Sequence, residues 1–540
     1  MRKILFLVIL FGLNACMKSE SVDLVIFNAN IHGLDEKNQT HQAMAIRDGK
    51  IIEMGPDRQI LNKYRFENSI DAEGKEIYPG FIDAHGHLFS YAELKLGANI
   101  LGCESEEDML TRVHQYQDNS KRDIVIGLGW DQSLWELTDL PNNSRLNEEF
   151  PETPVCLFRI DGHSALVNEA FIEKIDDVHS DIRGGEVLMT NGMPNGMFID
   201  AAISLLEPHI PDYSIAEIKR ELLNIQKELF GFGITGVHEA GIDYNELGIL
   251  REMVEDESLR LNIYAMLNPT AENKSFALTN GPYKSKNLRV RSFKAYVDGA
   301  LGSSGALLKN DYSDKPNYRG LSLMSSEELN KLSEFCLDVG YQLNSHGIGD
   351  SAISIILDMC SSAYKANPDH RFRIEHAQIV DIKDLHKFAD YGVFPSVQPT
   401  HATTDQRWIE SKIGAGRMKG AYAFKSLKDQ LGMIALGTDF PVEYTNPFYT
   451  IHASVHRKNF NNEPAEGFLI DEALTFEETL KGMTFWNAFS AFEEGYLGTL
   501  EVGKNATFVI LDKPLNRSSN FMGNFSWKTY IDGRLVHSLE

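Results

Sequence analysis

The sequence predicts an α/β protein: a β/α barrel with a long insertion near its start and a small β-rich domain built from both ends of the chain. Three features support this prediction. Short apolar runs alternate with helical stretches from residue 77 to 491, both ends of the chain alternate apolar and polar residues as strands do, and an extra segment follows the first barrel strand. A length of 540 residues with 43% hydrophobic content supplies one large core and a smaller one.

The first residues are typical of an export signal. Arg2 and Lys3 precede an apolar run at positions 4–13, which is too short to span a bilayer because a span needs roughly twenty residues. The run ends in Leu13-Asn14-Ala15-Cys16, which resembles the lipobox of bacterial lipoproteins, where the cysteine is lipidated. We expect residues 1–16 to be this signal, and the mature protein to be exported, facing the periplasm and held at a membrane only by the lipid on Cys16. An ordinary secretory signal is the alternative.

The two ends of the mature chain are predicted to form one small β-sandwich, with residues 22–76 as its first part and residues 492–540 as its second. In the first part, alternating residues lead into Asp48-Gly49, a typical hairpin turn. In the second part, the apolar run 506–511 precedes a hairpin that turns at Asp532-Gly533. Because two strand-rich ends flank one long middle, we expect them to pack as a single domain.

The middle of the chain, residues 77–491, is predicted to be the barrel, with the insertion around residues 101–207. Helical segments such as 214–230 and 325–339 repeat apolar residues at three- and four-residue spacing. Between such segments lie short apolar runs that we predict to be strands. These runs are 80–84, 124–127, 155–158, 234–237, 292–296, 342–345, 373–376, 393–397 and 434–437.

The charge balance excludes nucleic acid as an expected partner. The chain has 52 Lys and Arg against 77 Asp and Glu, and this formal net charge of −25 repels phosphate backbones. We therefore expect a small-molecule substrate. Beyond Cys16, four cysteines remain without metal-finger or redox-pair spacing, and a core of this size accommodates either buried thiols or disulfides. They are Cys103, Cys156, Cys336 and Cys360.

A pair of histidines ends the first predicted barrel strand. In Phe81-Ile-Asp-Ala-His-Gly-His87, His85 and His87 are two residues apart, so both imidazoles project to the same side. In β/α barrels, the side chains that perform chemistry lie where the strands end. A strand that ends in two aligned imidazoles is typical of a metal site. The pair therefore predicts a metal centre at this end of the barrel.

Later strands end in further residues of the ligand type. His346 and His376 each terminate a predicted strand, although either one alone is better explained as a hydrogen-bonded structural histidine than as a ligand. Asp439 follows the apolar run 434–437, where a carboxylate needs a cation or hydrogen-bond donors to stay ionised. Their shared placement after the first histidine pair favours one common site.

A lysine also lies within a predicted barrel strand. Lys294 shares a strand face with Tyr296 and Asp298. A lysine inside a barrel must be paired, deprotonated or modified, because burial of an unpaired ammonium is costly. One modification is reaction with carbon dioxide, which gives an anionic carbamate that can bridge two metal ions.

Taken in chain order, these residues resemble the site of the amidohydrolase superfamily. The local sequence is most similar to its amidohydrolase 3 group, which includes exported and N-substituted formamide deformylase-like members. The matching segments extend over nearly the whole mature chain. They include Pro79-Gly-Phe-Ile-Asp-Ala-His-Gly-His87, Gly129-Trp-Asp131, Asp161-Gly-His163, Asp298-Gly-Ala-Leu-Gly-Ser303, Ser345-His-Gly-Ile-Gly-Asp350, Arg373-Ile-Glu-His-Ala-Gln378, Gln398-Pro-Thr-His401 and Gly437-Thr-Asp-Phe-Pro441.

The resemblance implies a TIM-like (β/α)8 barrel of the metal-dependent hydrolase type and assigns roles to its residues. His85 and His87 become ligands of the more buried metal, and Lys294 becomes the candidate carbamylated bridge. His346 and His376 become ligands of a second metal or hydrogen-bond donors beside the substrate, with His346 also a catalytic candidate. Asp439 is implied to be both a ligand and the general base. The expected cofactor is Zn²⁺, as one or two ions.

The expected function is hydrolysis of a non-peptide carbon–nitrogen bond in a small amide, N-formyl compound or cyclic amide, by water activated at the metal. A deaminase or lactonase with the same centre, and a lipoprotein that binds a metal or ligand without turnover, are the alternatives. A homodimer is compatible with the family. Residues near the inserted segment or beside strand ends are expected to line the substrate pocket. These are Trp130, Asp131, His163, His238, Asp298 and His401.

Overall fold

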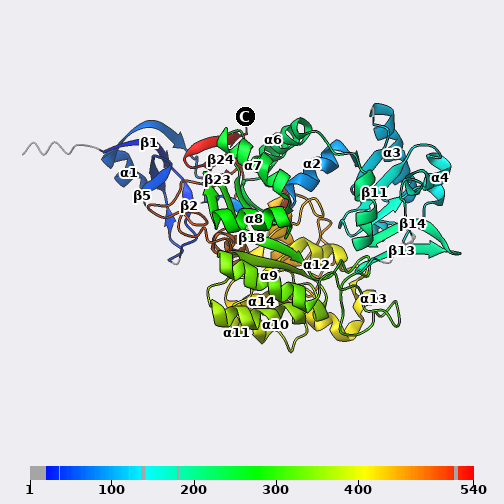
Figure 1. The fold of residues 1–540 in the computed structure, drawn as a ribbon. Coiled ribbons are helices and arrows are strands. Elements are labelled where there is room, and N and C mark those ends of the chain that lie inside the picture. The colour runs from blue at the N-terminus through cyan, green and yellow to red at the C-terminus, as the bar shows by residue number, and fades with distance from the viewer. Residues whose placement is uncertain are drawn as a thin grey trace, which may run out of the picture.

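The computed structural model describes residues 20–35, 37–120, 122–135, 140–178, 182–515 and 521–539. The predicted signal and Cys16 lie outside these residues. Figure 1 shows a central barrel, a β domain that carries the two chain ends on one side of it, and an inserted domain on the other. Within the described ranges, no helix is long and apolar enough to cross a membrane.

The predicted barrel is confirmed. Eight parallel strands pair in the order β8-β15-β16-β18-β19-β20-β21-β22, and a short strand, β17 (Tyr283–Ser285), pairs antiparallel with β18. Almost every residue of the eight strands is buried, as expected for a parallel sheet covered by helices. Their bounds are β8 (Phe81–Gly86), β15 (Ile234–Ile242), β16 (Asn262–Leu267), β18 (Leu288–Tyr296), β19 (Gln342–Gly347), β20 (Arg373–His376), β21 (Phe394–Val397) and β22 (Ala435–Leu436).

One barrel strand was absent from the sequence prediction. Strand β16 is an apolar run with five of its six residues buried, and such a run cannot be distinguished from a buried helix by periodicity. The predicted strands at 124–127 and 155–158 do form, but they belong to the inserted domain as β10 (Val125–Trp130) and β11 (Val155–Arg159).

Helices cover the outside of the barrel (Figure 1). Helix α9 shows how the sequence sets their limits: Ser325 and Glu328 form a capping box at its start, and Gly340 ends it in the left-handed conformation. The principal helices are α2 (Leu88–Leu96), α6 (Ile215–Gly231), α7 (Tyr244–Glu255), α8 (Ala271–Asn280), α9 (Ser326–Val339), α10 (Asp350–Ala366), α11 (His386–Asp390), α12 (Pro399–Asp405), α14 (Phe424–Leu431), α15 (Pro447–His456), α16 (Phe476–Gly482) and α17 (Phe485–Ser490).

Both chain ends contribute to the β domain. A four-stranded sheet, β5-β4-β1-β6, and a six-stranded sheet, β25-β24-β23-β7-β2-β3, enclose a core that includes Ile26, Ile46, Phe508 and Ile510. Strand β23 pairs with β7, so the last segment of the chain is joined to the strand that leads into the barrel. The bounds are β1 (Glu20–Phe27), β2 (Asn30–His32), β3 (Thr40–His41), β4 (Ala43–Arg47), β5 (Lys50–Gly55), β6 (Tyr64–Asp71), β7 (Glu76–Pro79), β23 (Phe508–Leu511), β24 (Ser526–Ile531) and β25 (Arg534–Ser538).

The inserted domain lies between α2 and α6, after the first barrel strand. Its sheet has the order β13-β14-β12-β11-β10-β9, and α3 (Glu106–Asn119) packs against it. The insertion thus begins slightly before residue 101, at strand β9. The four cysteines of the described chain are free and buried, so the disulfide alternative does not hold. The remaining strands are β9 (Ala98–Asn99), β12 (Ser164–Val167), β13 (Gly185–Thr190) and β14 (Met193–Asp200).

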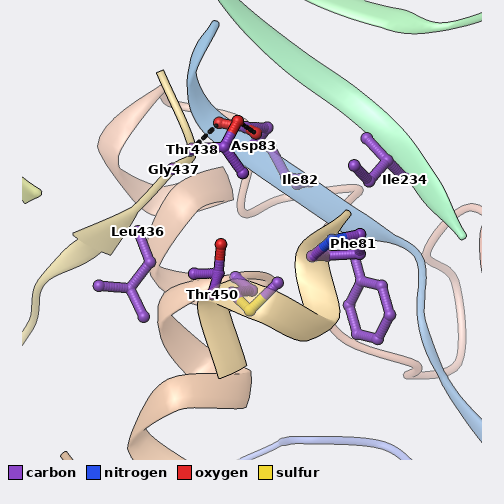
Figure 2. A pocket seen from close by; sticks show the side chains of 10 residues that line it. Phe81, Ile82, Asp83, Ile234, Leu436, Gly437, Thr438 and Thr450 are labelled. Atoms are coloured by element: carbon purple, nitrogen blue, oxygen red, sulfur yellow. Dashed lines mark hydrogen bonds between the residues drawn. The ribbon is translucent and has the colours of Figure 1, made fainter. Parts of the chain in front are cut away.

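The barrel closes where β8 meets the chain after β22. The Asp439 N–H donates to the His85 carbonyl at 2.8 Å, and the His87 N–H donates to the Phe440 carbonyl at 2.8 Å. Beside this seam, the Asp83 carboxylate accepts hydrogen bonds from the Thr438 backbone at 3.0 Å and from its hydroxyl at 2.6 Å. Figure 2 shows this pair above a small cavity of about 10 Å³ that Thr450 also lines.

This seam yields a stability test with a matched control. Thr438→Val removes a hydroxyl donor to a buried carboxylate, and we expect the free energy of unfolding to fall by about 1.5–3 kcal/mol. The Thr450 hydroxyl is buried without a hydrogen-bond partner among the described residues, so Thr450→Val should be neutral or stabilising. Denaturant titration of both variants measures the difference; equal stabilities would contradict a structural role for the Thr438–Asp83 bond.

Candidate metal centre

Three buried ligand-type side chains meet at the carboxyl ends of the barrel strands. One ligand atom each of His85, His376 and Asp439 lies within 4.8 Å of the others. His87 joins them, with its Nε2 atom 3.1 Å from Oδ1 of Asp439. The His346 ring centroid lies 4.5 Å from that of His376. The structure therefore places the four predicted histidines and Asp439 together, although they come from strand ends that lie far apart in sequence.

The backbone at two of these residues adopts an unusual conformation. His376 has a φ of 75° and Asp439 a φ of 63°, a region that residues with a Cβ rarely occupy. Such a conformation costs on the order of 1–3 kcal/mol and persists where the surrounding structure fixes it. At Asp439, the hydrogen bond from its N–H to the His85 carbonyl provides that restraint. The chain turns sharply here and directs the carboxylate toward the histidines.

A buried charge pair holds His85 from behind. Oε2 of Glu375 lies 2.6 Å from Nδ1 of His85, and Nε of Arg373 donates to Oε1 of Glu375 at 2.7 Å. Arg373 also donates to the Ala84 carbonyl at 3.0 Å. Neither Arg373 nor Glu375 was among the predicted site residues. A usable signal existed, because two opposite charges two residues apart in a buried strand must share a face and a partner.

These contacts prepare His85 to act as a ligand. Burial raises the pKa of Glu375, but Arg373 and His85 outweigh burial and hold that pKa below its usual range. Burial and the charge of Lys294 lower the pKa of His85 to about 4, so its ring is neutral at physiological pH. Because Glu375 accepts the Nδ1 hydrogen, the lone pair is on Nε2, which faces the site.

Asp439 is ionised in this environment. Burial opposes its charge, but the neighbouring histidines, His85 first and His87 next, outweigh burial and lower its pKa below the usual range. Oδ1 of Asp439 and Nε2 of His346 are buried without a hydrogen-bond partner among the described residues. Neutral imidazoles, a carboxylate and unsatisfied buried acceptors form a donor set that suits Zn²⁺. The residues present thus fit a divalent ion.

Lys294 lies at the centre of the same group. Its side chain is buried on β18, and Nζ is 3.0 Å from Nε2 of His85. Burial lowers the pKa of Lys294 to about 8. An appreciable fraction of the amine is therefore uncharged near neutral pH, which is the form that reacts with carbon dioxide.

A cavity of about 1140 Å³ opens from this centre. Its wall combines barrel loops with the inserted domain, and Asp131, His163 and His401 of the predicted pocket set line it. His163 comes from the insertion: its Nδ1 atom is 2.6 Å from Oδ1 of Asp200, and its ring centroid is 5.1 Å from that of His346. The inserted domain therefore reaches the residues around the metal centre.

The other three predicted pocket residues lie in the packed interior rather than on the cavity wall. Trp130 is fully buried and its indole N–H donates to the Leu157 carbonyl at 2.7 Å. Nδ1 of His238 lies 2.9 Å from the Arg373 guanidinium, beneath the centre. Asp298 accepts hydrogen bonds from the backbone N–H groups of three loop residues, which joins the loop after β18 to the loop after β19. These donors are Leu307, Ile348 and Gly349.

An eight-stranded parallel barrel with this cluster at its strand ends defines the class of metal-dependent hydrolase barrels. The model of the amidohydrolase family matches residues 68–537. The chain belongs to the amidohydrolase family, and the resemblance noted in the sequence is confirmed.

Known proteins of similar sequence and structure extend over most of the chain. Protein LONG AFTER FAR-RED 3 of Arabidopsis thaliana is 31% identical over 95% of this chain and 91% of its own length. N-substituted formamide deformylase of Arthrobacter pascens is 24% identical over 95% of this chain and 98% of its own. The crystal structure of an uncharacterized metal-dependent hydrolase from Pyrococcus horikoshii superposes with a TM-score of 0.75 at 25% identity, covering 92% of this chain and 99% of that chain.

The contact between Glu375 and His85 predicts a loss of metal affinity when the carboxylate is removed. Glu375→Gln should weaken zinc binding about 10- to 100-fold, because the amide holds the imidazole less firmly and makes it less basic. Competition with a chelator measures this change. Glu493→Gln is the control, since Glu493 is also buried but accepts from the Tyr496 hydroxyl outside the centre. Unchanged zinc affinity in Glu375→Gln would contradict the assigned role.

Proposed function

We propose that the protein is a metal-dependent amidohydrolase that cleaves a non-peptide carbon–nitrogen bond of a small amide, with Asp439 as the general base. One observation carries the proposal: His85, His376 and Asp439 converge within 4.8 Å of one another, and His376 and Asp439 line the 1140 Å³ cavity. Membership of the amidohydrolase family supports the reaction class. N-substituted formamide deformylase, a relative along nearly the whole chain, supports an amide or formamide substrate.

The proposed steps use the charge state of Asp439. Its low pKa keeps the carboxylate ionised at neutral pH, so it can take a proton from the attacking water. The water oxygen forms a bond with the carbonyl carbon, and the carbonyl electron pair moves to oxygen. The carbon–nitrogen bond then breaks, and Asp439 returns the proton to the leaving nitrogen. The products are a carboxylic acid and an amine.

We propose that His85, His87, His376 and Asp439 hold a divalent ion, with zinc as the expected metal. Such an ion would act as a Lewis acid and lower the pKa of water at the site. His346 faces the same space, where it would hold a second ion or bind the substrate. Two ions require a bridge, and Lys294 would supply it as a carbamate: the Nζ lone pair attacks carbon dioxide, and the nitrogen loses a proton.

A panel of N-formyl and N-acyl amines, dipeptides and cyclic amides tests the proposed reaction. Zinc-loaded protein should release an amine, with formate or another acid, from at least one class of non-peptide amide. Lactones and amino-substituted heterocycles belong in the same panel. Turnover confined to lactones, or ammonia release from the heterocycles alone, would instead identify a lactonase or a deaminase. Protein without zinc or another transition metal after expression with zinc would refute the scheme.

Replacement of the proposed base should separate catalysis from folding. We expect Asp439→Asn to lower kcat by about 10²- to 10⁴-fold, the usual contribution of a general base, while most bound zinc is retained. Asp384→Asn is the control, because this buried carboxylate pairs with Lys309 outside the cavity. Kinetics, elemental analysis and thermal melting are measured on both variants. Undiminished turnover in Asp439→Asn would remove Asp439 as the base.

The modification of Lys294 needs direct observation, since a carbamate does not survive denaturation. In crystals grown with zinc and bicarbonate, we expect electron density for a carboxylate group beyond Nζ, in contact with metal. Lys294→Ala should then bind fewer zinc ions per chain than the wild type. An unmodified amine directed away from the metal, or equal zinc content in the variant, would refute the bridge.

A further inference from the structure

Two imidazoles beside the metal centre lie nearly parallel but have different partners. His376 ends β20 and His401 lies on α12, and their ring planes differ by 16° with centroids 6.1 Å apart. Oε1 of Gln398 accepts a hydrogen bond from Nδ1 of His376 at 3.0 Å. Nε2 of Gln378, an amide N–H group, lies 3.2 Å from Nδ1 of His401.

These partners specify opposite tautomers. A carbonyl oxygen beside Nδ1 of His376 requires the hydrogen on Nδ1, so the lone pair is on Nε2, as in a metal ligand. An amide N–H that donates to Nδ1 of His401 requires the lone pair there, so the hydrogen is on Nε2. Gln398 therefore leaves His376 with an acceptor nitrogen at Nε2. Gln378 leaves His401 with a donor N–H at Nε2.

The Nε2–H group of His401 lacks an acceptor in the part of the chain that the structure describes. The residue is 7% exposed, and its Nε2 atom makes no hydrogen bond there. Nε2 lies 3.7 Å from Oδ2 of Asp439, too far for a hydrogen bond, and His401 lines the large cavity. Because Nδ1 of His401 accepts from Gln378, the N–H of this ring lies at Nε2.

We propose that His401 is a further catalytic residue, whose Nε2–H donates to the carbonyl oxygen of the substrate as this oxygen gains negative charge, and that Gln378 is the positioning residue that keeps the hydrogen on Nε2. The proposal rests on the proposed hydrolysis. The location suits the role, because a donor beside the base faces the group that the water attacks. A fixed donor of this kind stabilises the transition state more than the neutral carbonyl.

Three variants test the donor. His401→Phe keeps a ring but removes the N–H, whereas His401→Gln restores an amide N–H near the Nε2 position. Gln378→Leu removes the amide donor that fixes the tautomer of His401. In His401→Phe we expect kcat to fall about 10²- to 10³-fold with KM nearly unchanged, as when one oxyanion donor is lost. His401→Gln should recover at least part of this loss, and Gln378→Leu should lie between the wild type and His401→Phe. His386→Phe, at an exposed histidine on α11, is the control.

A binding measurement makes the test independent of turnover. Phenylphosphonate carries anionic oxygens on a tetrahedral centre, so its affinity for zinc-loaded protein should fall with kcat across the variants, while affinity for the product amine stays within about threefold. Zinc content and melting temperature are measured alongside. The proposal is overturned if His401→Phe binds phenylphosphonate like the wild type, or if zinc loss alone explains the lower kcat. If the wild type hydrolyses no amide, the proposed function is refuted. The difference in phenylphosphonate affinity between the wild type and His401→Phe still decides whether His401 donates a hydrogen bond to an anion.

Discussion

The barrel closes through backbone hydrogen bonds that the candidate ligand residues make themselves. The Asp439 N–H donates to the His85 carbonyl, and the His87 N–H donates to the Phe440 carbonyl. The first and last strands of the barrel are therefore held in register at the point where their side chains meet. Any slip at this seam would move Asp439 relative to both histidines. The backbone hydrogen bonds that close the barrel therefore also bring His85, His87 and Asp439 together.

The buried charges of Arg373 and Glu375 are tolerated because each has a defined partner. Arg373 and Glu375 are fully buried, and together they satisfy the Ala84 carbonyl and Nδ1 of His85. A buried ion pair of this type is rarely the most stable choice, since apolar residues of equal volume would avoid its desolvation. The pair instead fixes the geometry of the site, because it sets the orientation and the tautomer of His85, the candidate ligand on the first barrel strand.

The parts of the molecule that were predictable share a local signal. Ligand-type residues at the ends of apolar strands located His85, His87, His346, His376 and Asp439, because barrel topology brings every strand end to one face. The missed features depend on partners remote in sequence. Glu375 meets His85 across 290 positions, and His238 contacts Arg373 below the centre instead of lining the cavity. Strand β16 was not predicted because a short, mostly apolar run has no period that identifies it as a strand.

The inserted domain contributes side chains to the cavity beside the candidate metal centre. His163, held by Asp200, approaches His346 from outside the barrel, and Asp131 of the same domain lines the cavity. The candidate metal ligands all lie on the barrel and its loops. Changes in the insertion can therefore alter which molecule reaches the centre while the ligand geometry stays fixed. In this architecture the barrel strands carry the candidate ligands, and the segment between the first and second barrel strands supplies part of the cavity wall.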